Sequence, residues 1–112
     1  MTSKDIAKIS QLTDCALEVV TSHLCIGTAT VDFVCRDQDS GDIVVLKQID
    51  ILSSSNLGEV FLCAAETDAK TIILVSENTT PEQFRMVDKL TQITDFTFYL
   101  VKCLISIHTR LC

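Results

Sequence analysis

Apolar side chains recur every three or four positions near the start of the chain. Such spacing places them on one face of a helix, and Thr2 with Asp5 resembles a capping pair ahead of them. Gly27 is a typical residue just beyond a helix end. The pattern therefore predicts an amphipathic helix over residues 5–24, whose apolar face holds Ile6, Ile9, Leu12, Ala16, Val19, Val20 and Leu24.

Residues 28–51 change to a pattern of strands. Ala29, Val31, Phe33 and Cys35 alternate with their neighbours, which is typical of a half-buried strand. Turn-forming residues fill positions 37–42, and a β-branched apolar run follows at 43–46. We predict a β-hairpin over residues 28–51, with its second strand in the centre of a sheet and covered on both faces.

Two further helices and two further strands are predicted in the second half. Asn56 begins a helix over residues 57–66, and the continuous apolar run at 71–75 indicates a buried parallel strand. Thr80, Pro81 and Gln83 form a helix start with a capping box. Residues 96–107 are strongly β-prone and predict the last strand.

The predicted order is α-β-β-α-β-α-β. It indicates an α/β fold, with α+β as the alternative, in which helices pack on a four-stranded mixed sheet. The 112 residues are enough for one core, so we expect a single domain over 1–112.

Charge argues against a nucleic-acid partner, and hydropathy argues against secretion and a membrane span. The chain carries 9 Lys and Arg against 15 Asp and Glu, a formal net charge of -6, and its basic residues form no cluster. We therefore expect no nucleic-acid partner. The first residues lack the apolar core of a signal peptide, and no run approaches the roughly 18 apolar residues of a membrane span. These features predict an intracellular protein, cytoplasmic or nuclear, without a membrane span.

The six cysteines are interpreted as free thiols. They lie mostly among apolar residues, where cysteine behaves as a small hydrophobic side chain. None of them shows the close pairing that a zinc site needs. No glycine-rich phosphate loop is present either, so we expect no cofactor.

The order of helix, hairpin, helix, strand, helix and strand over residues 5–103 resembles restriction-endonuclease-like nucleases. The resemblance implies metal-dependent phosphodiester hydrolysis by an Asp on one hairpin strand and a Glu-x-Lys on the next. Asp32 and Lys47 match the Asp and the Lys, whereas Val45 stands where the Glu belongs. The acidic hairpin offers Asp32 and Asp42 as metal ligands in this alternative, since hard cations bind clustered carboxylates.

A second resemblance covers residues 28–103 and is to STAS domains, the anti-sigma-factor-antagonist fold. It is carried by Ile49-Asp50, by Leu57 in the following helix, and by the apolar strand at 72–75. The Asp-Ser phospho-acceptor of that family is missing, because residues 78–81 read Asn-Thr-Thr-Pro.

The lack of a complete catalytic motif favours a non-enzymatic protein-protein interaction module, a small subunit or an oligomerising regulator in an intracellular assembly. Its partner would be another protein or a second copy. The expected surface is the apolar last strand, with Phe96, Phe98, Leu100 and Leu104. The pattern leaves open whether this strand lies at the edge or in the centre of the sheet. The alternative function is a degenerate or weakly active restriction-endonuclease-like nuclease that uses Asp32 and Lys47.

Overall fold

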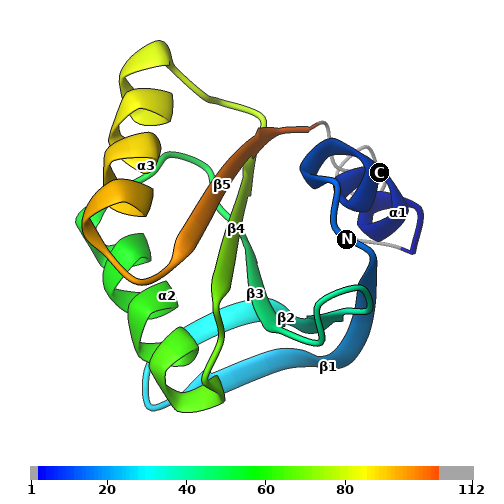
Figure 1. Ribbon diagram of the computed structural model, residues 1–112. Coiled ribbons are helices and arrows are strands. Elements are labelled where there is room, and N and C mark those ends of the chain that lie inside the picture. Colours follow the sequence, from blue (N-terminus) through cyan, green and yellow to red (C-terminus); the bar gives the residue numbers. More distant parts are fainter. Residues whose placement is uncertain (1–2, 104–112) are drawn as a thin grey trace, which may run out of the picture.

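The computed structural model describes residues 3–103 and has the predicted mixed α/β fold (Figure 1). Its sheet has five strands rather than four, because a strand that the sequence pattern did not predict precedes the hairpin. The elements are α1 (Ser3–Thr13), β1 (Leu17–Ile26), β2 (Ala29–Asp37), β3 (Ile43–Gln48), α2 (Ser54–Thr67), β4 (Thr71–Ser76), α3 (Pro81–Ile93) and β5 (Thr97–Lys102).

The strands lie in the sheet in their order along the chain, β1-β2-β3-β4-β5. The first three form an antiparallel meander, and β3, β4 and β5 run parallel to one another. Helices α2 and α3 connect the parallel strands and cover one face of the sheet, whereas α1 lies on the other face (Figure 1). The antiparallel half therefore meets the parallel half at β3.

The predicted helix over residues 5–24 is wrong beyond residue 13. Helix α1 ends at Thr13, Asp14 takes a left-handed backbone conformation, and residues 17–26 form β1. The apolar spacing continues by chance into a segment where Val19, Val20 and Thr21 are β-branched. Pairing with β2 along the whole strand then outweighs the weak helical periodicity.

The predictions for the hairpin and the buried strands are confirmed. Strands β2 and β3 are antiparallel, and β3 lies in the centre of the sheet between β2 and β4. Val45 faces α2, whereas Val44 and Leu46 face α1, and all three side chains are buried. The apolar run at 71–75 is the parallel strand β4, which is likewise buried on both faces.

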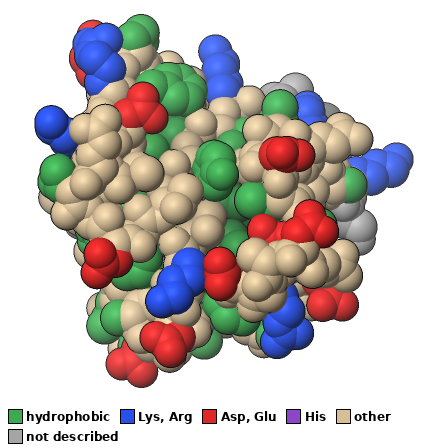
Figure 2. Space-filling model, in the orientation of Figure 1, with side chains coloured by type: hydrophobic (Ala, Val, Ile, Leu, Met, Phe, Trp, Pro, Cys, Tyr) green, Lys and Arg blue, Asp and Glu red, His purple; other side chains and the backbone are tan. Residues whose placement is uncertain are grey.

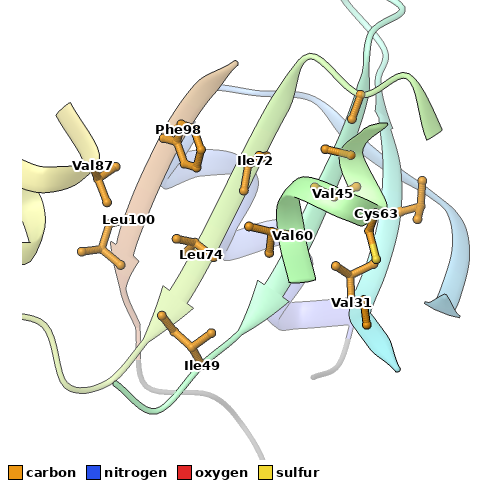
Figure 3. Close-up of a cluster of buried hydrophobic side chains, with 14 residues drawn as sticks. Val31, Val45, Ile49, Val60, Cys63, Ile72, Leu74, Val87, Phe98 and Leu100 are labelled. Atoms are coloured by element: carbon orange, nitrogen blue, oxygen red, sulfur yellow. The ribbon is translucent and has the colours of Figure 1, made fainter. Parts of the chain in front are cut away.

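The last strand is an edge strand whose apolar side chains nevertheless belong to the core. Strand β5 pairs with β4 alone among the strands of residues 3–103. Phe98 and Leu100 point toward the helical layer in the cluster of Figure 3, near Val87 of α3. Residues 104–107 of the predicted strand lie outside the described residues.

Helix starts follow local capping chemistry. At α3 the capping box is present, with Thr80 accepting from the backbone N–H of Gln83 at 3.2 Å and Pro81 in the first turn, as predicted. At α2 the cap is Ser53 instead of Asn56, because the Ser53 hydroxyl accepts from the backbone N–H of Asn56. No helix within residues 3–103 has the length and apolar character that a membrane span requires.

Candidate functional site

Strands β2 and β3 separate at one point, and polar side chains bridge the gap there. The backbone register of this pair ends at Phe33 and Leu46. One residue before Phe33 on β2, the Asp32 carboxylate Oδ2 accepts a hydrogen bond from the backbone N–H of Gln48 at 2.6 Å. The carboxylate thus takes the place of a backbone carbonyl in the ladder. We call this point, made by residues 30–32 and 47–48, the fork.

Lys47 bridges the same gap in the opposite direction. Its Nζ donates to the backbone carbonyl of Thr30 at 2.7 Å and to the Thr30 hydroxyl at 3.3 Å. The same Nζ lies 3.5 Å from Glu59 Oε1 on α2. Glu59 in turn accepts from the backbone N–H of Thr30 through Oε2 at 3.2 Å. Two strands and a helix therefore meet in one polar network.

The Lys47 ammonium is buried and fully engaged. The residue is 8% exposed, and a lysine ammonium has three N–H donors. These three donors match the three acceptor atoms within reach, two on Thr30 and one on Glu59. The Lys47 charge also affects the Cys63 thiol on α2. Burial raises the pKa of this thiol, and the positive charge of Lys47 offsets part of the rise.

A polar recess of about 410 Å³ opens at the fork, at the carboxyl ends of β3 and β4. Asp50 and Asn78 close part of it, with Asn78 Nδ2 donating to Asp50 Oδ1 at 2.8 Å. Ser76 ties the two strand ends together, because its hydroxyl donates to the Asp50 carbonyl at 2.7 Å and accepts from the Asn78 N–H at 2.9 Å. The recess is lined by Asp32, Gln48, Ile49, Asp50, Glu77 and Asn78.

The structure places both Asp32 and Lys47, the two residues matched to the nuclease motif, at the fork. They form no ion pair with each other in the described part of the chain, since Lys47 Nζ is held by Thr30 and Glu59. Val45 lies deeper, paired with Val34 and fully buried. A carboxylate at position 45 would therefore lie inside the core.

Asp42 is not near Asp32. It precedes β3, in the turn where its carbonyl accepts from the Asp37 N–H at 2.9 Å. Asp32 instead binds Gln48, six residues further along the chain, which at the rise of a strand separates the two by about 20 Å. The structure therefore does not bring together the two metal ligands expected from the acidic hairpin.

The side chains at the fork fit a divalent cation poorly. Within residues 3–103, no three His, Cys, Asp or Glu side chains form a group that could hold a metal ion. Calcium and magnesium are held by several oxygen ligands, and Asp32 already uses one carboxylate oxygen for Gln48. Asp32 is the carboxylate of the fork itself, and Asp50 and Glu77 are the other carboxylates that line the recess.

Sequence reasoning missed Glu59 and Thr30. Glu59 stood out only as a residue near the start of a helix, and Thr30 only as a polar position of a strand. No local pattern links a strand lysine to a helix glutamate twelve residues later. Their contact arises because α2 crosses back over β2 and β3.

Of the four residues expected to form an interaction surface, the three that the structure describes lie wholly or partly in the interior. Phe98 is 5% and Leu100 8% exposed, and Phe96 is half-buried. The rings of Phe61, Phe96 and Phe98 lie 5.6 to 6.3 Å apart, centroid to centroid. Leu104 lies outside the described residues.

The face shown in Figure 2 carries no basic stripe. Its Lys and Arg side chains lie apart from one another, and Asp and Glu side chains stand between and beside them. With a net charge of -6, such a face attracts a phosphate chain weakly at best.

Comparison with known proteins gives one strong structural match. It is the crystal structure of a repair endonuclease from Pyrococcus abyssi, with a TM-score of 0.61 and 18% sequence identity. The match covers 92% of this chain and 47% of the endonuclease, so the chain spans about half the length of that protein. No family model matches the sequence, and no curated protein does. At this identity the match shows a shared fold.

This match corrects the expected function. The sequence favours a non-enzymatic interaction module, but the fold is shared with about half of a repair endonuclease, and this supports the alternative better. The elements that carried the STAS resemblance are present as α2 and β4, and they are equally parts of the endonuclease-like order. They therefore do not distinguish the two resemblances.

Proposed function

We propose that the chain is a degenerate restriction-endonuclease-like nuclease that cleaves phosphodiester bonds weakly. The observation that carries the proposal is the position of Asp32 and Lys47 at the fork of β2 and β3. The resemblance assigns these two residues to the metal carboxylate and the lysine of the site. The fold shared with part of a repair endonuclease supports the class of function.

The degeneracy has a structural basis. The position that the resemblance gives to the second carboxylate is Val45, which is buried in the core. Asp32 alone at the fork would hold a divalent ion weakly, and Lys47 is turned toward Glu59. In active sites of this kind a divalent ion supplies charge neutralisation and an activated water. We therefore expect slow cleavage that needs a high metal concentration.

Substrate binding would not rest on a basic surface. The net charge of -6 disfavours a long nucleic-acid interface, and the sequence alone predicts no nucleic-acid partner. The proposal departs from that prediction. It requires only a short contact at the fork, where added divalent cations offset the carboxylates of the recess.

The test is cleavage of end-labelled single- and double-stranded oligonucleotides in millimolar Mn²⁺ or Mg²⁺. We expect slow cleavage by the wild type that is lost in Asp32→Asn. The matched control is Asp39→Asn, which makes the same change in the exposed turn of the same hairpin and should leave cleavage intact.

Two outcomes would overturn the proposal. One is the absence of any cleavage that depends on Asp32. The other is turnover at or above about 1 s⁻¹, the rate of an ordinary enzyme, which would show that the site is not degenerate. Amide line broadening by Mn²⁺ provides a second readout, expected at residues 32, 48–50 and 77–78.

A further inference from the structure

The Lys47 ammonium and the backbone N–H of Thr30 form a pair of donors suited to an anion. Both point at the same group, because Glu59 Oε1 lies 3.5 Å from Lys47 Nζ and Glu59 Oε2 accepts from Thr30 N at 3.2 Å. A carboxylate bound by a cation and a backbone N–H resembles a phosphate held by the same donors.

We propose that Glu59 occupies this anion-binding pair from within the chain and so withholds Lys47 from a substrate phosphate. The contact is then an internal inhibitor of the fork, which the nuclease motif does not include. Its effect on cleavage rests on the proposed function, whereas its effect on Lys47 does not.

The contact between Lys47 and Glu59 is largely shielded from solvent. The side chain of Lys47 is 10% exposed and that of Glu59 is 27% exposed, so solvent screens the pair only partly. The other two ammonium donors are bound by Thr30. A phosphate at Asp32 would therefore have to displace one of these acceptors, and the Glu59 carboxylate is the one that it resembles.

The structure also provides space into which Glu59 could move. Glu59 borders a second cavity of about 390 Å³ between the β1–β2 turn and the first turns of α2. Gly58 beside it faces open space, because a Cβ placed there would have no atom within 4 Å. This cavity is the space that the Glu59 side chain would enter on leaving Lys47.

The first arm of the test measures the accessibility of Lys47. Brief acetylation of the folded protein with an amine reagent, followed by peptide mass spectrometry, gives a labelling rate for each lysine. In the wild type we expect Lys47 to be labelled slowest. Glu59→Gln should raise its rate about tenfold, the loss expected when a charged hydrogen-bond partner is removed. Glu66→Gln, at an exposed position of the same helix, makes the same charge change and should have no effect.

Glu59→Asp is the second variant, since it keeps the charge but withdraws the carboxylate by one methylene. Circular dichroism identifies which variants are folded. An unchanged Lys47 labelling rate in folded Glu59→Gln and Glu59→Asp would overturn the proposal. A rise in either folded variant, without a rise in Glu66→Gln, supports it.

The second arm measures cleavage that depends on Asp32. We expect Glu59→Gln to cleave several-fold faster than both the wild type and Glu66→Gln. Faster labelling with unchanged or slower cleavage would show that Glu59 does not restrain the reaction. Faster labelling with no cleavage in any variant would count against the nuclease function, while the internal occupancy of the anion-binding pair would stand.

Discussion

Asp32 and Lys47 each bind the other's strand across the fork of β2 and β3. The Asp32 carboxylate accepts from the Gln48 N–H on β3, and the Lys47 ammonium donates to the Thr30 carbonyl on β2. The two bonds cross where the backbone ladder ends, so they hold the separating strands together. The residues matched to the nuclease site therefore also have a structural role.

Replacing Asp32 should destabilise the fold, because its carboxylate accepts a backbone hydrogen bond. Asp32→Ala leaves the Gln48 N–H without its acceptor and should lower the free energy of unfolding by about 1–3 kcal/mol. Asp32→Asn keeps an oxygen acceptor and should cost less. Urea denaturation of the two variants checks this order. Equal stability of Asp32→Ala and the wild type would show that the bond contributes nothing.

Val45→Glu supplies the Glu that the motif lacks, yet we expect it to destabilise the protein without restoring cleavage. Val45 is fully buried against α2, so the new carboxylate would be removed from water. The Lys47 ammonium on the same face of β3 is already bound by Thr30 and Glu59. The expected loss is at least about 3 kcal/mol, the size seen for an uncompensated buried charge. Urea denaturation measures it.

Val45→Ala is the control for packing alone at this position. It removes bulk without adding charge and should cost about 2 kcal/mol. A folded Val45→Glu variant with faster metal-dependent cleavage would show that position 45 does reach the site.

Phe98 should matter for stability rather than for association. Its ring packs against Phe61 at 5.6 Å and Phe96 at 6.3 Å under the helical layer. Phe98→Ala should lower the free energy of unfolding by about 3–5 kcal/mol. Phe84→Ala, at a position 39% exposed on α3, should cost less than about 1 kcal/mol. Chemical denaturation measures both variants, and similar losses in the two would contradict this account.

The buried thiol of Cys35 should resist alkylation. Burial raises the pKa of Cys35 from 9.0 to about 11, because the apolar surroundings disfavour the thiolate. Since only the thiolate reacts, its rate should stay low at pH 8 and rise as the pH approaches 11. Cys25 is exposed and should react before Cys35. Iodoacetamide labelling over a pH series, read by mass spectrometry, checks this. Equal rates for the two cysteines at pH 8 would contradict it.

The raised pKa of Cys35 also makes the stability of the fold depend on pH in the alkaline range. A thiol whose pKa is raised by folding stabilises the fold fully below pH 9, and that contribution is lost as the pH rises toward 11. Replacement by Val keeps the apolar volume and removes the titration. The free energy of unfolding of the wild type should therefore fall relative to that of Cys35→Val as the pH rises from 9 toward 11.

Local signals in the sequence determined much of the fold. The capping box at Thr80 and Gln83, the apolar run of β4 and the turn before β3 are set by neighbours in the chain, so they could be predicted. Residues 14–24 could not, because their apolar spacing fits a helix while their β-branched side chains suit a strand. Pairing with β2 decides between these two states, and that energy is not local.

The sequence also identified Asp32 and Lys47 as the residues of the nuclease resemblance. Only the tertiary structure decided what surrounds them. In the fold, Asp42 lies at the opposite end of β3 from Asp32, and Val45 is buried in the core. Glu59 of α2 contacts the Lys47 ammonium. Spacing along the chain specifies which face of an element a side chain occupies. Which elements meet at that face depends on how the helices pack over the sheet, and packing is a property of the whole fold.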